Sequence, residues 1–351
     1  MGLSSRKPDH ARRGAGADRR ADRGKASPRP RAGGSAGGLI VSLLLAGALH
    51  ADPLSLATWN ADLSRDGPGL LLRDIGGGEL AAVVTEIAEV APDVLLLTDV
   101  DYDHGGVALR ALADALDAAG ARYPHRFARR PNAGRPTGLD LDGDGLLGGP
   151  RDAQGYGEFS GQGGMAVLST RPLSLVAAFT DLLWSDLPGN LRQAEDPAPK
   201  VQRLSSSAHW VLSLDTGSTP LALLAWAATP PVFDGPEDRN GRRNHDELGL
   251  WMQCLDGGLG CALPGAPVLI GNANVDPVRG DGRHEAIAQV LADPRLQDPL
   301  PDAPTVVWDG PGPMRVSYIL PAAGLEVIGA EVRPPVEGQR HRLVSVTLSL
   351  P

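Results

Sequence analysis

From residue 53 onward, short apolar runs alternate with amphipathic stretches, and this alternation limits the fold more than any other feature. The apolar run Val94–Leu97 has the length of a buried strand, and the preceding segment Glu79–Val90 repeats apolar residues at helical spacing. Strands and helices that mix without strict repetition favour a layered α/β or α+β domain. Residues 53–351 contain neither an internal repeat nor an evident linker, so we expect them to form one domain.

The same pattern predicts the remaining regular elements. We expect strands at Leu54–Trp59, Gly164–Ser169, Leu173–Phe179, Ala208–Leu214, Leu221–Ala227, Pro267–Ile270, Arg315–Leu320, Leu325–Ile328 and Arg342–Leu350. We expect further helices at Val107–Ala119, Arg243–Leu255 and Arg283–Leu291. The segments 129–163 and 180–203 are predicted to be long loops, which are common places for functional sites.

Charge is distributed unevenly along the chain. Residues 1–38 hold ten Lys and Arg against three Asp, a balance of +7. Subtracting this balance from the net charge of −9 leaves −16 for residues 39–351. A body this acidic does not attract a long polyanion, so the composition disfavours non-specific binding of nucleic acid.

The first 51 residues have the composition of an export signal. Residues 1–38 are rich in Arg, Gly, Ala and Pro, and we interpret them as a disordered basic leader. The apolar run 39–48 is too short to span a bilayer, which needs about 20 residues. With small residues at Ala46, Ala48 and Ala51, it predicts a signal peptide ending within 39–51 and a periplasmic or secreted protein. The alternative is that the run forms a buried strand of the domain.

The chain has two cysteines, Cys254 and Cys261, joined by a flexible glycine-rich link. In an oxidising compartment the two are able to form a small-loop disulfide. The alternative is a pair of unpaired thiols, and the spacing does not suggest a zinc site.

Four predicted strand ends carry polar side chains. These are Asn60, Asp99 with Asp101, Asn272 with Asn274, and His341. In layered α/β proteins, polar groups at the tips of buried strands often converge on one site. Taken singly, an Asn or Asp after a strand is usually only a turn starter, so the argument depends on the four together.

Three longer motifs accompany these strand ends: Thr58-Trp59-Asn60, Gly138–Pro150 (GLDLDGDGLLGGP) and Thr229–Glu247 (TPPVFDGPEDRNGRRNHDE). In this order they resemble the endonuclease/exonuclease/phosphatase family, and the resemblance is closest to a bacterial, often exported branch. It covers nearly all of residues 53–351. The resemblance implies a DNase I-like four-layer sandwich, in which helices flank two packed mixed β-sheets. It also implies a divalent ion such as Mg²⁺ or Mn²⁺ and the hydrolysis of phosphate esters.

That chemistry needs three kinds of group. A hard cation on carboxylate and amide oxygens neutralises the developing phosphoryl charge. A base activates water, and a histidine stabilises the phosphoryl oxygens. Each of these groups is expected at the position where this sequence matches the family's motif.

On the metal side, the match is partial. Asn60 matches the family's amide near the ion, and Asp99 stands where the family usually has glutamate, one methylene longer. The family's aspartate-x-asparagine pair falls on Asn272 and Asn274. Asn274 matches, whereas Asn272 has lost the charge, and an amide cannot accept a proton from water as a general base.

On the histidine side, most of the pattern is lost. The family's closing serine-aspartate-histidine triplet falls on Gln339-Arg340-His341, so only His341 remains. Ala227 stands where the family has a second catalytic histidine, and Ser317 where it has an aspartate. Because such groups act together, their combined loss predicts lost or strongly reduced hydrolysis, as in a pseudoenzyme.

Whether the chain is an enzyme stays open, and two alternatives remain. One is an active divalent-metal-dependent phosphodiesterase or phosphatase that uses Asp99, Asp101 or Asp276 as replacement ligands. The other is a calcium-stabilised binding protein. As partners we expect a small phosphate ester or a lipid headgroup rather than long nucleic acid, and we expect a monomer.

The calcium alternative depends on Asp140, Asp142 and Asp144, which with Gly145 match the D-x-D-x-D-G start of a calcium loop. The twelfth position is Arg151 rather than glutamate, and no flanking helices are evident. The alternative is an acidic loop of Asx turns that needs no ion.

Other polar residues are given structural roles. We expect His245 to cap the start of a helix or to pack at the surface, and His209 to lie in the core. We expect Arg239, Arg242 and Arg243 to be solvated and paired with nearby acidic residues, namely Asp234, Glu237 and Asp238.

Overall fold

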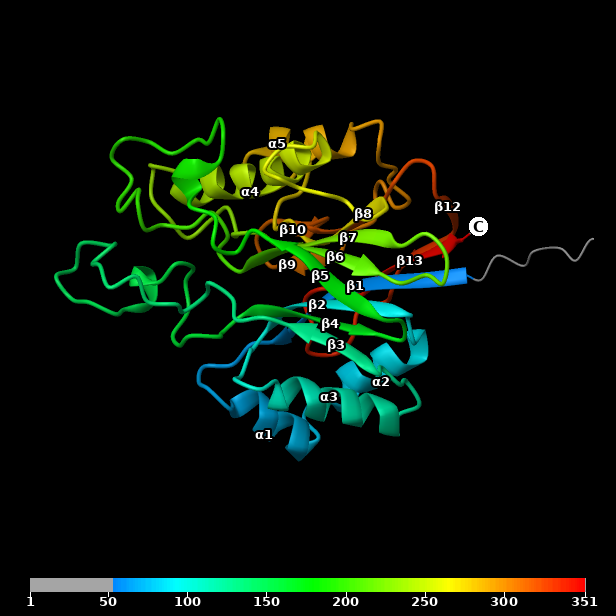
Figure 1. The fold of residues 1–351 in the computed structure, drawn as a ribbon. Coiled ribbons are helices and arrows are strands. Elements are labelled where there is room, and N and C mark those ends of the chain that lie inside the picture. Colours follow the sequence, from blue (N-terminus) through cyan, green and yellow to red (C-terminus); the bar gives the residue numbers. More distant parts are fainter. Residues whose placement is uncertain (1–52, 351) are drawn as a thin grey trace, which may run out of the picture. The chain divides into compact units, whose positions relative to one another are not determined.

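Two β-sheets lie face to face, and helices cover the outer face of each (Figure 1). The computed structural model describes residues 53–350, which lie within one compact unit, Leu49–Pro351. The basic leader at 1–38 and the apolar run at 39–51 lie outside the described residues, so the signal-peptide hypothesis stays a prediction. The expected α/β sandwich is confirmed.

The first sheet is mixed, with strand order β12-β13-β1-β2-β4-β3. Its strands are β1 (Pro53–Leu63), β2 (Val94–Val100), β3 (His125–Ala128), β4 (Gly164–Ser169), β12 (Glu326–Val332) and β13 (Val344–Ser349). β1 and β2 run parallel, and the other neighbours are antiparallel. β2 lies in the middle and is apolar along most of its length, as expected for a strand buried on both faces.

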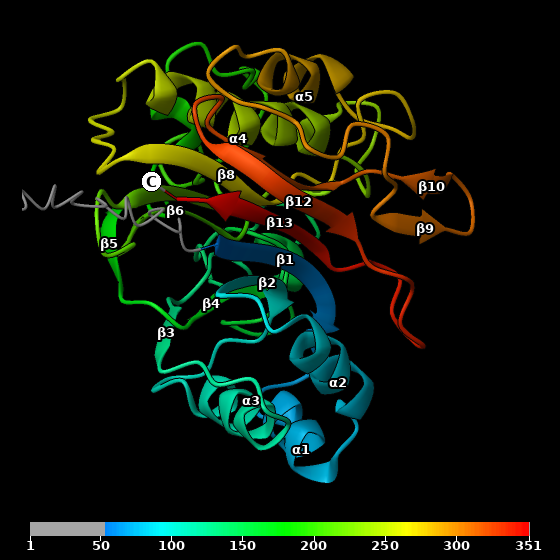
Figure 2. The ribbon, with the colours of Figure 1, turned by 90° about the vertical axis from the view of Figure 1, so that its right-hand side faces the viewer.

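The second sheet is also mixed, with strand order β11-β8-β7-β6-β5. Its strands are β5 (Leu173–Ala178), β6 (Ala208–Leu214), β7 (Leu221–Ala227), β8 (Ala266–Asn272) and β11 (Ser317–Pro321). β6 and β7 form an antiparallel hairpin, and β7 and β8 run parallel. A separate two-stranded ribbon, β9 (Val306–Trp308) and β10 (Gly312–Met314), projects from one end of the sandwich (Figure 2).

Within residues 53–350, five α-helices complete the layers. They are α1 (Leu70–Gly77), α2 (Ala81–Val90), α3 (Val107–Ala118), α4 (Arg239–Leu255) and α5 (His284–Leu291). The first three cover the first sheet, and the last two cover the second (Figure 1). Among the described residues, no helix combines the length and the apolar character needed to cross a membrane.

Three apolar cores hold the layers together. The central core lies between the sheets and includes Leu56 and Leu96 from the first sheet and Trp210 and Ile270 from the second. The two outer cores lie under the helices, where Trp59 packs on one side and Trp251 on the other. The sheets therefore bury both faces, and their polar residues gather at the strand ends.

The loops 129–163 and 180–203 are long, as predicted, and contain only short 3-10 turns at Pro150–Asp152 and Trp184–Asp186. Cys254 and Cys261 are bonded, which closes the turn after α4. Of the two alternatives for the cysteines, the structure has the disulfide.

The elements that the sequence did not predict are α1, β3, β9 and β10, all short. α4 also begins at Arg239, four residues before the predicted start. The first turns of α4 are polar and therefore lack the apolar spacing by which a helix is recognised. His245 consequently lies inside the helix, half-buried against Asp246, so the expectation of surface packing agrees with the structure and that of capping was wrong.

Candidate functional site

The first sheet presents Asn60 and Thr98 to the second sheet. Leu54 and Leu56 of β1 lie in the central core, and side chains of a strand alternate between its two faces. Asn60 therefore lies on the same face as these leucines, two residues beyond Thr58. On β2, Leu96 lies in the central core, so Thr98 shares its face. The parallel register places Asn60 beside Thr98.

The second sheet presents Asn272 and Ser317 to the first. Ile270 of β8 and Ile319 of β11 lie in the central core, and the same alternation brings Asn272 and Ser317 to that face. Asn272 pairs with Ser317 on one side and with Ala227 on the other. Strands β8 and β11 pack across the core against β1. The substituted base position and two other substituted positions are therefore direct neighbours.

Hydrogen bonds join His341 to both sheets. The indole Nε1 of Trp59, beside Asn60, donates to the carbonyl oxygen of His341 at 3.0 Å. The next residue, Arg342, donates its backbone N–H to the carbonyl oxygen of Thr305 at 2.8 Å. The hydroxyl of Thr305 accepts the backbone N–H of Ser317 at 3.1 Å. The strand ends bearing Asn60, Asn272 and His341 thus meet at one end of the sandwich, which we call the tip site.

Asp99 lies on the flank of the tip site rather than opposite Asn272. It follows Thr98 in a bulge of β2, with φ of 57°, so its side chain leaves the row that faces the second sheet. Its Oδ1 atom lies 3.1 Å from the point where a Cβ on Gly163 would be. Burial, then the charges of Asp62 and Asp101, raise the pKa of Asp99 to about 6.

The two asparagines at the family's aspartate-x-asparagine positions are hydrogen-bonded to each other. Asn272 Nδ2 donates to Asn274 Oδ1 at 3.0 Å, and the backbone N–H of Asn274 donates to Asn272 Oδ1 at 3.0 Å. Asn274 Nδ2 donates to the carbonyl oxygen of Ala228 at 2.7 Å. Asn272, which is 2% exposed, therefore brings no proton acceptor to the tip site.

Asp276, one of the three proposed replacement ligands, is already engaged by the backbone. Its Oδ1 atom accepts the N–H groups of Val278 and Arg279, both at 2.8 Å. Its Oδ2 atom accepts the N–H of Arg315 at 2.6 Å. These contacts are those of a carboxylate that holds a turn.

Asp101 is engaged in a similar way. Its carboxylate accepts the Ser64 hydroxyl at 3.2 Å, the N–H of Arg65 at 3.0 Å and the N–H of Gly163 at 3.2 Å. It ties the loop after β1 to the loop before β4. Of the three proposed replacement ligands, Asp99 alone makes no hydrogen bond among the contacts of the described residues.

His341 is 7% exposed, and its Nδ1 atom has no hydrogen-bond partner. The Trp308 ring lies 5.4 Å away at 88°, edge to face, and the Arg340 guanidinium carbon lies 5.7 Å from the centre of that ring. Burial, and secondarily the charge of Arg340, lower the pKa of His341 to about 4. His341 is therefore neutral at neutral pH, with no carboxylate to orient its ring within the described part of the chain.

The groups at the tip site do not fit the divalent ion that the sequence resemblance implies. Asn60, Asn272, Thr98 and Ser317 offer amide and hydroxyl groups on the facing strands, whereas Mg²⁺ is held in proteins mainly through carboxylates and phosphate oxygens. Asp99 is the remaining carboxylate of the expected ligand set, and it lies on the flank. The predicted Mg²⁺ or Mn²⁺ site at Asn60 and Asp99 would thus have a single carboxylate, and it stays an untested prediction.

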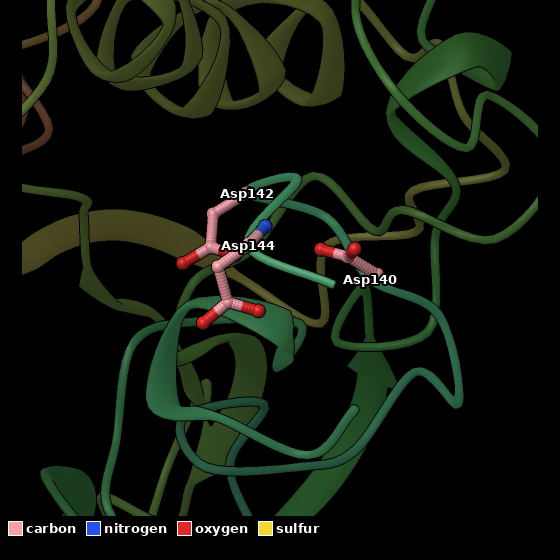
Figure 3. A group of neighbouring side chains, drawn as sticks. All are labelled: Asp140, Asp142 and Asp144. Carbon is pink, nitrogen blue, oxygen red and sulfur yellow. The ribbon is translucent and has the colours of Figure 1, made fainter. Parts of the chain in front are cut away.

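A separate acidic group lies in the long loop before β4. One oxygen from each of Asp140, Asp142 and Asp144 lies within 4.8 Å of the others, at the surface (Figure 3). Asp140 accepts the N–H groups of Gly143 and Gly145 at 2.7 and 2.9 Å. Within residues 53–350 this is the group of acidic side chains that could hold a metal ion.

The polar face of α4 is buried, although the sequence predicts that it is exposed to solvent. Arg242 and Arg243 are 2% and 6% exposed, so the expectation of solvated, locally paired arginines was wrong for both. Arg242 pairs with Asp196 at 2.6 Å, a residue of the other long loop. Arg243 donates to the backbone carbonyls of Leu204 and Gln154, both at 2.6 Å. α4 therefore anchors the loops around the tip site.

Asn244 and Glu247 extend this anchoring to the strand ends. Asn244 Nδ2 donates to the carbonyl oxygens of Thr229 and Ala273, both at 2.7 Å, and Ala273 separates the two asparagines of the tip site. Glu247 accepts the N–H groups of Thr229 and Ser206 at 2.5 and 2.9 Å. These positioning contacts were missed because a charged stretch is normally assigned to a solvated face.

His209 lies fully buried in β6, as expected for a core residue. Its Nδ1 atom contacts the Ser205 hydroxyl, and burial lowers its pKa to about 3. It belongs to the packing between α4 and the second sheet, where its ring lies 5.5 Å from that of Trp251.

The two packed sheets, with polar strand ends meeting at one end of the sandwich, define a protein of the DNase I-like fold class. The model of the Endonuclease/Exonuclease/phosphatase family matches residues 57–341. The chain belongs to the endonuclease/exonuclease/phosphatase family. No curated protein matches the sequence.

The chain is similar to several solved structures. The endonuclease/exonuclease/phosphatase from Beutenbergia cavernae is 19% identical, with a TM-score of 0.53 over 85% of this chain and 72% of that one. A family protein from Bacteroides thetaiotaomicron is 12% identical, with a TM-score of 0.49 over 86% of this chain and 98% of that one. The human Nocturnin catalytic domain is 15% identical, with a TM-score of 0.49 over 86% and 95%. At these identities the likeness concerns the fold alone.

Proposed function

We propose that this chain is an exported phosphate-ester-binding protein of the endonuclease/exonuclease/phosphatase family whose hydrolytic activity is lost or strongly reduced. The observation that carries the proposal is the hydrogen-bonded amide pair of Asn272 and Asn274, at the position where the family has its proton acceptor. Removal of one such catalytic group costs about 10²–10⁴ in rate. The substitutions at Ala227 and Ser317, both paired with Asn272, lower the rate further. Because the three groups act together, the combined loss is smaller than the sum of the separate effects on the activation free energy.

The contacts of the other carboxylates support the same proposal. Asp276 and Asp101 are engaged by backbone N–H groups, so neither is free to replace the missing base. His341 is neutral and lacks the carboxylate that would hold it as an imidazolium. The ligand that we propose is a small phosphate ester or a lipid headgroup, because the acidic body repels a long polynucleotide.

One observation favours a second candidate, an active metal-dependent phosphoesterase. Asp99 is free of hydrogen bonds, and its pKa of about 6 would allow it to exchange protons near neutral pH. Its carboxylate also lies near Asp62 and Asp101, whose negative charge would favour a cation. In this candidate Asp99 serves as the replacement ligand.

The experiment that separates the two candidates is an assay of the purified protein with Mg²⁺, Mn²⁺ or Ca²⁺. The substrates are bis(p-nitrophenyl) phosphate, plasmid DNA and inositol phosphates, and Asp99→Ala is compared with Asp215→Ala, an exposed aspartate in the turn between β6 and β7. We expect turnover at the level of the buffer for all three proteins. Metal-dependent turnover that Asp99→Ala abolishes and Asp215→Ala keeps would establish the active candidate instead.

A restoration experiment tests the positions themselves. The triple variant Asn272→Asp, Arg340→Asp and Ala227→His returns the missing base, the orienting carboxylate and the second histidine to adjacent strand ends. We expect metal-dependent hydrolysis of bis(p-nitrophenyl) phosphate to appear in the folded triple variant. An inert triple variant with native circular dichroism would show that the family's catalytic positions have been assigned incorrectly.

The calcium-stabilised alternative concerns a different part of the chain. The three aspartates at 140, 142 and 144 could hold a metal ion, and we propose Ca²⁺ because exposed carboxylates in a flexible loop suit its larger coordination shell. This ion would order the loop before β4 and is independent of any chemistry at the tip site.

A further inference from the structure

Arginines flank His341 at the tip site without carboxylate partners. Arg340 is exposed, and its guanidinium lies over the Trp308 ring. Arg342 is half-buried, and its Nε atom is buried without a hydrogen-bond partner. Neither belongs to the ion pairs formed among residues 53–350, in contrast to Arg315 nearby, which pairs with Asp298 at 2.5 Å.

Two carboxylates on this side of the tip site are engaged by other groups. Asp298 is paired with Arg315, and Asp276 accepts three backbone N–H groups. Asp62, Asp99 and Asp101 lie on the flank formed by β1 and β2. The tip site therefore has a cationic side around His341 and an acidic side around Asp99.

Polar atoms without partners accompany this positive charge. The hydroxyls of Thr98 and Ser317, each on the face of its sheet that meets the other sheet, are buried and make no hydrogen bond. The Nδ1 atom of His341 is buried and unpartnered as well. Because an unmet buried polar atom is costly, these atoms are available to a polar ligand at the tip site.

Three substitutions make the tip site more positive than the sequence resemblance implies. Asn272 and Ser317 each stand for an aspartate, and Arg340 replaces an aspartate with a cation. Together the three substitutions make the tip site more positive by four units of charge. A carboxylate-lined site needs a divalent cation before a phosphate can enter, whereas a site with guanidinium groups binds the oxyanion directly.

We propose that the tip site binds the phosphoryl group of its ligand without a divalent cation, and that Arg340 supplies the positive charge that a metal ion would otherwise supply. This inference rests on the proposed function, since it assigns the mode of binding at the same site. The guanidinium of Arg340 contacts the phosphoryl oxygens from the exposed side, and Ser317 and Thr98 donate from the interior. The ligand class is a small phosphate monoester or free phosphate.

The test is isothermal titration calorimetry of the purified protein with inorganic phosphate and with p-nitrophenyl phosphate, in EDTA and in excess Mg²⁺. We expect the same dissociation constant in both solutions. Arg340→Asp should weaken binding in EDTA by about 10- to 100-fold, the effect of losing a charge-assisted hydrogen bond. Arg126→Asp is the matched control, because Arg126 is an exposed, unpaired arginine on the edge strand β3, and its binding should be unchanged.

The outcomes separate the inference from the proposed function. Binding that requires Mg²⁺, or that Arg340→Asp leaves unchanged, would overturn the inference and leave the proposed function in place. No binding in either solution would overturn both. If Arg340→Asp does not fold, Arg340→Gln removes the charge while keeping a polar side chain, and weaker binding that depends less on salt than that of the wild type is then the expected result.

Discussion

Trp59 and His341 are 282 residues apart in the chain, yet the indole Nε1 of Trp59 donates a 3.0 Å hydrogen bond to the carbonyl oxygen of His341. Trp59 is fully buried in the core under α1–α3, so this bond is shielded from water. It holds the segment before β13 against the end of β1, where Asn60 lies. The placement of His341 therefore depends on a side chain that does not itself face the tip site.

Trp59→Phe should accordingly lower the free energy of unfolding by more than the loss of ring volume alone would explain. The variant leaves the carbonyl oxygen of His341 buried and unpaired, which adds about 1–3 kcal/mol to the loss of stability. Trp251→Phe is the control, since Trp251 is equally buried but its Nε1 atom makes no hydrogen bond. Urea unfolding measures both. Equal losses in the two variants would show that the Trp59 hydrogen bond is not a stabilising contact.

His341 should make the stability of the protein depend on acid pH. Its pKa is about 4 in the folded chain and about 6.5 in the unfolded chain, so the unfolded state binds the proton first. The contribution of neutral His341 is complete above pH 6.5 and is lost as the pH falls towards 4, by about 3 kcal/mol. We expect the difference in unfolding free energy between wild type and His341→Gln to change by this amount between pH 7.5 and pH 4.

The comparison with His341→Gln also removes the effects of other buried groups. His209, with a pKa of about 3, acts in the same direction, whereas Glu247, with a pKa raised to about 7, acts in the opposite one. Both are present in the variant and cancel in the difference. A difference that stays constant across this pH range would mean that His341 is solvated in the folded protein.

Much of the fold was predictable because its strands are buried on both faces. The runs Gly164–Ser169, Ala208–Leu214 and Leu221–Ala227 were predicted with the bounds that β4, β6 and β7 have. In each, a mainly apolar run ends close to turn residues such as Arg171-Pro172 or Asp215-Thr216-Gly217, so the boundary is visible in the sequence. The start of α4 was not visible, because the side chain of Arg242 is buried through an ion pair with a distant loop.

The candidate site was predictable in part for the same reason. Strand ends indicated Asn60, Asn272 and His341, and these do meet at one end of the sandwich. Thr98 was missed, although it shares a face with Val94 and could have been found from the two-residue period. The position of Asp99 on the flank follows from a bulge in β2, and no residue pattern in the sequence of β2 predicts that bulge.

The Cys254–Cys261 disulfide should stabilise the folded protein modestly. It closes a short loop after α4, with a sequence separation of 7 residues. The loss of chain entropy in the unfolded state corresponds to about 2 kcal/mol for a loop of this length. We expect the melting temperature to fall on reduction with dithiothreitol, and the double variant Cys254→Ala and Cys261→Ala to melt at the reduced value whether or not dithiothreitol is present. A double variant that melts like the oxidised wild type would contradict a stabilising role.

Calcium should raise the melting temperature through the loop that carries Asp140, Asp142 and Asp144. An ion that binds the folded state alone, at 100 times its dissociation constant, adds about 2.7 kcal/mol, or roughly 5 °C for a domain of this size. Asp142→Asn is the informative variant, because Asp140 holds the backbone of Gly143 and Gly145, whereas Asp142 accepts a single N–H at 3.3 Å. The variant should melt like wild type in EDTA and lose the calcium effect, while Asp215→Asn should keep it. If calcium has no effect on wild type, or an equal effect on Asp142→Asn, the three aspartates form an acidic turn without an ion.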